Sequence, residues 1–130
     1  MPTIRRDGVK AAVVQSRIDQ GDKEKNWRRA VALARPALTE GVDLIVFPEA
    51  FVSGVNFIIL RQMAEPVPGP TVERLSALAA EHDVHVVAGV LEAGDDGRIY
   101  DSAVVIDRAG RLLGRYRRRF AWVGERAYVS

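Results

Sequence analysis

Residues 41–49 read Gly41-Val-Asp-Leu-Ile-Val-Phe-Pro-Glu49, an apolar run that stops at a proline and a carboxylate. The run from Val42 to Phe47 predicts a strand, and Pro48 ends it because proline cannot donate a hydrogen bond to a neighbouring strand. Ligands of open α/β sheets gather outside the carboxyl ends of strands, so Glu49 is a candidate general base. The alternative for an isolated Pro-Glu pair is a solvated loop glutamate.

The segments before this run predict a strand and then a helix. Residues 9–15 form a short, mostly apolar stretch that is typical of a strand. Gly41 suits the position that ends a helix, whereas Pro36 should kink the helix's last turns. A helix is expected over residues 23–40, where four apolar residues recur at helical spacing, namely Trp27, Val31, Ala34 and Leu38.

Downstream of Glu49 the pattern predicts two helices and three strands. A short helix is expected over 56–63, and a second one should begin at Pro70 or Thr71 and end near His82. The order of elements favours an α/β sheet with a parallel part and an antiparallel edge. The three strands are expected over 84–91, 99–106 and 112–118, joined by turns at 95–97 and 107–110.

The predicted strands indicate that one layer of the fold is missing. The central strands are apolar without clean alternation, which is typical of strands that are covered on both faces. Three predicted helices can cover one face only, so the other face needs a missing half or a dimer partner. We therefore expect residues 1–130 to form one partial domain.

Composition excludes several classes of protein. The chain is 48% hydrophobic and 28% charged, as in a soluble globular protein, and its net charge of +2 gives little support for nucleic-acid or membrane partners. The first apolar run is too short for a signal peptide or a membrane span, so a cytoplasmic location is expected. The sequence has no cysteine, which excludes disulfides, thiolate metal sites and, for this chain alone, a cysteine nucleophile.

A basic run, Arg115-Tyr-Arg-Arg-Arg119, follows the last apolar residues of the chain's final predicted strand. Strand alternation should turn Tyr116 and Arg118 to one face and the other arginines to the opposite face. The run is interpreted either as an anion or oxyanion site or as a charged edge strand that resists aggregation. No cofactor or metal is expected, because no glycine-rich phosphate loop follows an early strand and the two histidines, His82 and His85, lack a third ligand.

Several blocks of this sequence resemble, in order and spacing, the nitrilase or carbon-nitrogen hydrolase superfamily, in particular its amino-terminal half. The resemblance spans nearly the whole chain, and the first and last blocks are its most specific parts. The blocks are residues 41–49, Gly69-Pro70 at a helix start, Ile99-Tyr-Asp-Ser-Ala-Val-Val-Ile-Asp107, Gly110 and Gly114-Arg-Tyr-Arg-Arg118.

The resemblance implies half of a four-layer αββα sandwich, with a mixed sheet covered by helices on one face, and the family's Glu-Lys-Cys triad. It implies that Glu49 is the general base and that Glu125 helps to position substrate. The chain departs from the family at three positions. Arg118 occupies the place of the catalytic lysine, Phe120 that of a common histidine, and Asp101 that of a usual asparagine.

Two functions therefore remain open. The first is a carbon-nitrogen hydrolase half, truncated or split, that acts on small amides, nitriles or carbamoyl compounds and is inactive until a carboxyl-terminal half brings the cysteine. The second is a non-catalytic binding or assembly protein of the same fold, which Arg118 favours because arginine does not release a proton near neutral pH. Either protein is expected to form homo-oligomers or to bind a complementing half. Ser53 is a poor substitute nucleophile, because no histidine links it to Glu49.

Overall fold

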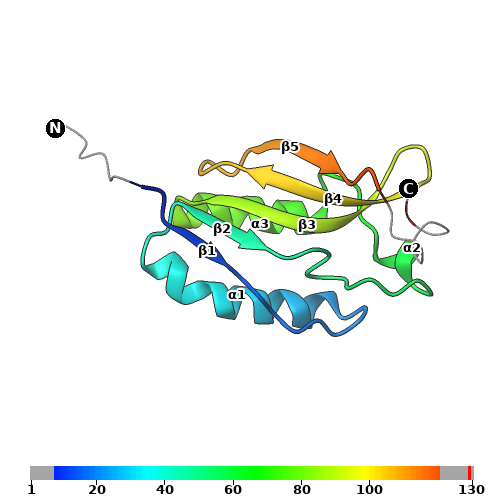
Figure 1. The fold of residues 1–130 in the computed structure, drawn as a ribbon, viewed down its shortest axis with the longest axis horizontal. Helices are drawn as coiled ribbons and strands as arrows, with labels where there is room; N and C mark the ends of the chain where they lie inside the picture. The colour runs from blue at the N-terminus through cyan, green and yellow to red at the C-terminus, as the bar shows by residue number, and fades with distance from the viewer. Residues whose placement is uncertain (1–7, 121–128, 130) are drawn as a thin grey trace.

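The computed structural model describes residues 8–120 and residue 129. They form one five-stranded sheet whose strands lie side by side in chain order (Figure 1). The elements are β1 (Ala11–Val13), α1 (Lys23–Thr39), β2 (Leu44–Phe47), α2 (Leu60–Met63), α3 (Pro70–His82), β3 (His85–Ala93), β4 (Ile99–Ile106) and β5 (Leu112–Arg117).

The sheet is mixed, as the sequence predicts. β1, β2 and β3 are parallel neighbours, whereas β4 and β5 pair antiparallel to the strands before them. The parallel connections contain α1 and then α2 with α3, because a parallel connection must return the chain along the length of the sheet. Glu49 directly follows β2, and Arg118 directly follows β5.

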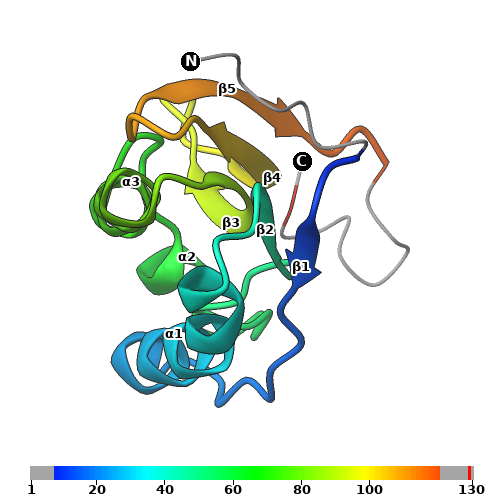
Figure 2. The same cartoon turned by 90° about the vertical axis from the view of Figure 1, so that its left-hand side faces the viewer.

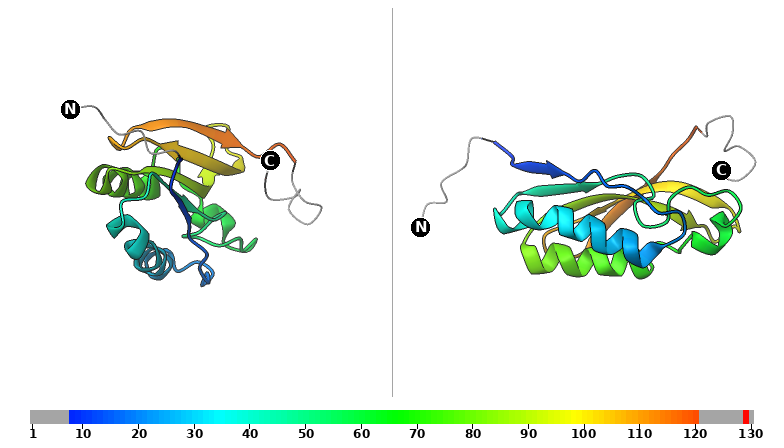
Figure 3. Two further views of the ribbon diagram at one scale, coloured as in Figure 1. Left: turned by 60° about the vertical axis from the view of Figure 1, so that its left-hand side comes forward. Right: turned by 90° about the horizontal axis from the view of Figure 1, so that it is seen from below.

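Helices α1 and α3 cover the same face of the sheet (Figures 2 and 3). An ion pair between Arg74 of α3 and Glu24 of α1 joins the two helices on their outer side. The prediction of a mixed sheet with helices on one face is confirmed, although α2 is a single turn and two helices provide most of the cover. The core between the layers includes Ala30, Leu38, Ile45, Phe47, Leu75, Val86, Ala88, Val104 and Ile106.

Local signals account for the length of α1. The side chain of Asp22 accepts a hydrogen bond from the backbone N–H of Lys25 and caps the first turn. Gly41 adopts a φ of +71° two residues after the helix, the left-handed conformation in which helices commonly end. Pro36 lies inside the helix, which continues to Thr39, because its missing N–H removes only one hydrogen bond near the helix end.

The face of the sheet opposite the helices, called the open face, carries a row of apolar side chains. Val13, Val46, Val87 and Val105 are register partners on four successive strands. Their strand neighbours, such as Phe47 and Ala88, point into the helix-covered core, so alternation turns the valines the other way. Val13 is 77% exposed, and within residues 8–120 no helix packs on the open face (Figure 2).

β5 contains a one-residue bulge. Val105 pairs with Gly114 and Ile106 pairs with Leu112, so Leu113 is an extra residue in the ladder. Strand β1 and helix α2 are shorter than predicted, because β1 is an edge strand that pairs only with Leu44–Val46 and the segment before α2 forms turns. No helix in the described part of the chain is long and apolar enough to cross a membrane.

Candidate active site

Glu49 leaves β2 through a close contact with the neighbouring strand. A Cβ atom on Gly89 of β3 would overlap the Cα atom of Glu49 and would lie 2.9 Å from the carbonyl oxygen of Pro48. Only glycine permits this approach, so the backbone of Glu49 rests directly on β3. The chain then turns sharply at Ala50, which is buried and has a φ of 45°. This path turns Glu49 toward the end of the sheet.

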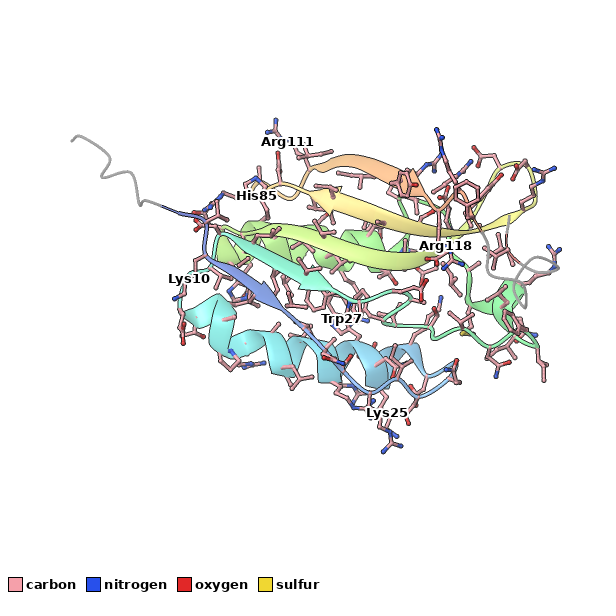
Figure 4. All side chains as sticks on the ribbon, viewed as in Figure 1. Lys10, Lys25, Trp27, His85, Arg111 and Arg118 are labelled. Atoms are coloured by element: carbon pink, nitrogen blue, oxygen red, sulfur yellow. The ribbon has the colours of Figure 1, made fainter. Side chains whose placement is uncertain are left out.

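Arg118 meets Glu49 from the other side of the site. Its backbone N–H donates to the carbonyl of Asp101 at 2.8 Å, which continues the ladder between β5 and β4. Its Nη1 atom donates to Glu49 Oε1 at 2.9 Å and lies 3.0 Å from Asp101 Oδ2. Figure 4 places Arg118 at the end of the sheet opposite His85 and Arg111. Two carboxylates thus hold one guanidinium.

These charged groups line a pocket of about 280 Å³ on the open-face side of the sheet. Small and apolar residues surround the charges, so a ligand here would contact both an apolar wall and a carboxylate with a cation. Such a combination is typical of small-molecule sites. The lining residues are Phe47, Glu49, Gly89, Asp101, Ser102, Ala103, Tyr116 and Arg118.

The basic run divides between the two faces, as alternation predicts. Tyr116 and Arg118 line the pocket, whereas Arg115 and Arg117 form ion pairs with Glu92 on the other face. The guanidinium of Arg117 also lies 3.9 Å from the centre of the Tyr100 ring. A charged edge strand is therefore an incomplete interpretation of this run, because its arginines make specific contacts on both faces.

Glu92 of β3 is a buried carboxylate that sequence reasoning missed. It is 0% exposed and accepts hydrogen bonds from Ser102 Oγ at 2.7 Å and from Arg117 Nη2 at 2.6 Å, while Arg115 Nη1 lies 2.6 Å away. Burial alone would raise the pKa of the Glu92 carboxyl, but the hydrogen bonds from Arg117 and Ser102 and the two positive charges hold that pKa below its usual range. The sequence contained one signal for this site, namely an acidic residue at the end of an otherwise apolar strand pattern.

Ser102 and Arg117 are register partners, and their sequence neighbours Asp101 and Arg118 form the charged part of the pocket. Asp101 and Arg118 therefore point to the open-face side, while their neighbours bind Glu92 on the helix-covered side. The Glu92 contacts thus fix the ends of β4 and β5 from the face opposite the site.

The other residues considered from the sequence lie outside this cluster. Glu125 falls outside the described residues. Phe120 is exposed, and the turn predicted at Ser53-Gly54 is present, with Gly54 N–H donating to the carbonyl of Ala50 at 2.8 Å. Ser53 is buried, and its Oγ has no hydrogen-bond partner among the described residues. Within the described residues, no group of three or more histidine, aspartate or glutamate side chains could hold a metal ion.

A second pocket of about 550 Å³ lies between α1 and α3. Trp27 and Leu38 line it from α1, and Arg74 and His82 line it from α3. The Arg74 guanidinium stacks 4.1 Å from the centre of the Trp27 ring and pairs with Glu24. These contacts identify Arg74 as a link between the two helices.

Comparison with known proteins gives the class of fold first. The Nit3 protein of Saccharomyces cerevisiae superposes with a TM-score of 0.81 at 25% identity, over 94% of this chain and 48% of that protein. An N-terminal amidase superposes with a TM-score of 0.83 over 92% of this chain and 30% of that one, and at 21% identity this match shows the fold alone. The fold is that of the nitrilase superfamily.

The family follows from the sequence matches. Residues 10–129 match the model of the carbon-nitrogen hydrolase family, and the chain belongs to that family. The omega-amidase NIT2 of Homo sapiens is 31% identical over 96 residues, which are 74% of this chain and 35% of the relative. The bifunctional nitrilase/nitrile hydratase NIT4B of Lupinus angustifolius is 33% identical over 85% of this chain and 37% of its own length. The chain thus spans little more than a third of these curated relatives.

Proposed function

We propose that Glu49 and Arg118 belong to the active site of a carbon-nitrogen hydrolase that acts on small amides, nitriles or carbamoyl compounds. The observation that carries this proposal is the 2.9 Å contact between Glu49 Oε1 and Arg118 Nη1 inside one pocket. Membership of the family supports the class of chemistry. The site also needs a thiol, which these 130 residues do not contain.

In this proposal Glu49 takes the proton of a cysteine thiol supplied by another polypeptide segment. For an amide or carbamoyl substrate, the thiolate sulfur attacks the carbonyl carbon, and the electron pair of the C=O bond moves to the oxygen, where Arg118 stabilises the negative charge. Collapse of this intermediate breaks the C–N bond, and Glu49 returns the proton to the leaving nitrogen. Water then hydrolyses the thioester, which releases the acid and restores the thiol.

Arg118 limits what the site can do. A guanidinium donates hydrogen bonds to an oxyanion but does not exchange its proton near neutral pH. If the reaction needs a proton from this position, the rate falls by about 10² to 10⁴ relative to a site with lysine. Glu125 is the proposed substrate-positioning carboxylate, on the resemblance of the sequence alone.

The open face supports the need for a partner segment. Val46, Val87 and Val105 form an apolar row on a sheet whose other face already packs against α1 and α3. A complementing carboxyl-terminal half, or a second copy of the chain, would remove this row from water. The greater length of the relatives favours the complementing half.

Reconstitution tests the proposal. The chain is co-expressed with the polypeptide encoded directly downstream and, separately, with the part of yeast Nit3 that it does not cover. Ammonia release is then measured with primary amides, nitriles and N-carbamoyl amines. We expect ammonia release that iodoacetamide abolishes, that Glu49→Gln lowers by about 10² or more, and that Arg118→Lys raises. A complex that co-purifies but releases no ammonia from any of the three classes contradicts the enzyme proposal.

The second candidate function is a non-catalytic binding or assembly protein, and Arg118 at the lysine position is the observation that favours it. This candidate retains the pocket without the proton transfer. If the protein is non-catalytic, an amide should bind the reconstituted complex without being hydrolysed. The variant Arg118→Lys should then show no hydrolysis either. Turnover by the unsubstituted complex excludes it.

A further inference from the structure

The groove between α1 and α3 is a cavity of about 550 Å³ that shares no lining residue with the pocket around Glu49. A cavity of this volume is large enough for a small organic molecule. Its walls come from two long helices of the fold, so its shape does not depend on a loop. The groove is therefore a candidate binding site that is separate from the hydrolase chemistry.

The floor of the groove is apolar. Leu38 of α1 and Leu78 of α3 are each 6% exposed, and Val31 is partly buried against the same core. On the α3 wall, Ala77 is exposed and contributes only a methyl group, which leaves space above the floor. A ligand in the groove would thus place an aliphatic group on these side chains and remove them from water.

One end of the groove is closed by a fixed pair of side chains. The guanidinium of Arg74 lies 4.1 Å from the centre of the Trp27 ring, and its Nη1 atom lies 2.9 Å from Glu24 Oε2. The charge of Arg74 is therefore already paired, and its flat side is covered by the indole ring. Arg74 and Trp27 act here as a wall.

The opposite end carries one positive and one negative side chain. Helices α1 and α3 connect successive parallel strands, so the two helices run in the same direction (Figure 3). Arg35 follows Trp27 by as many residues as His82 follows Arg74, which places Arg35 about level with His82. Glu81 precedes His82 and lines the groove with Arg35, so opposite charges flank this end from the two helices.

These two charged groups are not used by the fold. Within residues 8–120, the side chains of Arg35 and Glu81 form no ion pair or hydrogen bond, either with each other or with another group. An anion that approached Arg35 would be repelled by Glu81, and a cation that approached Glu81 would be repelled by Arg35. A ligand that carries both charges would satisfy both side chains.

We propose that the groove between α1 and α3 binds a free α-amino acid with an apolar side chain. Its carboxylate would pair with Arg35 and its ammonium group with Glu81, while its side chain would cover Leu38 and Leu78. The charges select a dipolar ligand, and the apolar floor selects an aliphatic side chain over a polar one. This binding site goes beyond the proposed hydrolase function and does not depend on it.

Four probes test the proposal on the 130-residue chain. Leucine, 4-methylpentanoate and 3-methylbutylamine share an isobutyl group but carry both charges, only the negative one and only the positive one, and glycine carries both charges without the isobutyl group. Each is titrated at low salt while the backbone amide signals of Val31 and Ala77 are followed by NMR. We expect leucine to bind at least about threefold more tightly than either singly charged analogue and about tenfold or more tightly than glycine.

Two substitutions assign the two charges. In Arg35→Gln the affinity ratio of leucine to 3-methylbutylamine should fall to about one, because the carboxylate loses its partner. In Glu81→Gln the ratio of leucine to 4-methylpentanoate should fall in the same way. Glu73→Gln, an exposed position on α3 outside the groove, is the matched control for Glu81→Gln and should leave both ratios unchanged.

A steric variant locates the site. Ala77→Leu fills the groove and should abolish the leucine-induced shifts, whereas Ala32→Leu, at an exposed position of α1 outside the groove, should retain them. Leucine binding that survives Ala77→Leu would place the ligand elsewhere and overturn the proposal.

Two further results would also overturn it. The first is leucine binding that is no tighter than binding of both singly charged analogues. The second is a set of Ala77 signals that change with protein concentration in the absence of ligand, since this would show that a second copy of the chain occupies the groove. Because every readout is binding to the groove, the presence or absence of ammonia release leaves the result unaffected.

Discussion

Arg118 Nη1 lies 2.9 Å from Glu49 Oε1, although 69 residues separate them in the chain and two strands, β3 and β4, lie between the strands that they follow. The side chains meet above Gly89 and Ala103, which are register partners on those two strands and line the same pocket. Small residues at this place leave room for the contact. The ion pair therefore depends on the sheet beneath it as much as on its own two members.

Replacing Gly89 with alanine should move Glu49. The added Cβ would overlap the Cα atom of Glu49, so the backbone after β2 must shift. We expect the free energy of unfolding to fall by about 1–3 kcal/mol, as for an overpacked core, and the ammonia release of the reconstituted complex to fall with it. Urea unfolding and the ammonia assay measure the two effects. Gly114→Ala is the control, because a Cβ there meets nothing within 4 Å; an equal loss in both variants would show that strand glycines are generally needed.

Glu92→Gln should be the most destabilising isosteric change among the carboxylates described. It leaves Arg115 and Arg117 without a negative partner in a place where Glu92 is 0% exposed. We expect a loss of roughly 2–4 kcal/mol in the free energy of unfolding, reduced from the full buried-pair value because both arginines are partly exposed. Urea denaturation measures it against Glu40→Gln, which removes a carboxylate from an exposed ion pair with Lys10 and should change stability by less than about 0.5 kcal/mol. A loss below about 1 kcal/mol would mean that the Glu92 charge is not needed.

The free energy of unfolding should also decrease at acidic pH, because Glu92 becomes protonated. The folded pKa of Glu92 is held below its usual range, so its contribution to the free energy of unfolding is present above the unfolded pKa of about 4.3 and is lost as pH falls through the lower folded value. The urea midpoint of the unsubstituted chain should therefore decrease from about pH 5 to pH 3 more steeply than that of Glu92→Gln. The other carboxyl groups with lowered pKa values contribute to the decrease that remains, namely Asp19, Glu24, Glu65, Asp96 and Asp107. Parallel plots of urea midpoint against pH for the two proteins would show that Glu92 does not cause the loss of stability in acid.

The open face should make the isolated chain bind a hydrophobic dye or self-associate. Val105→Lys places a charge in the valine row and should lower dye fluorescence or shift sedimentation toward the monomer. Leu33→Lys is the matched control, because Leu33 is exposed on α1, which packs on the other face of the sheet. A dye-silent monomer before any substitution would show that the open face needs no partner.

Local signals predict much of the fold. α3 begins at Pro70 and ends at His82, and β4 spans Ile99–Ile106, as the sequence indicates, because proline and turn residues act on their own neighbours. Strand alternation likewise predicts that Arg118 and Arg117 face opposite sides. The proximity of Glu49 and Arg118 follows from the family resemblance, because no local rule places the ends of β2 and β5 together.

The residues that sequence reasoning missed depend on distant partners. Glu92 reads as a polar residue at the end of an apolar strand, and only Arg117, 25 residues later in the chain, makes it a buried ion pair. From the sequence, Gly89 is expected only to weaken its strand. The contact that requires a glycine there, between a Cβ atom and the backbone of Glu49, comes from another segment of the chain. Propensity and periodicity describe neighbours in sequence, so they carry no information on such contacts.

The bulge at Leu113 sets the phase of everything after it in β5. Because one residue is inserted there, Gly114 falls opposite Val105, and the later residues alternate from that point. If Leu113 were itself paired with Val105, with no bulge, every later residue would change face, so that Arg117 would enter the pocket and Arg118 would turn toward Glu92. The bulge is thus the reason that Arg118, and not Arg117, reaches Glu49. Deleting Leu113 would leave this assignment intact, because Leu112 and Gly114 would then be consecutive residues of a regular ladder.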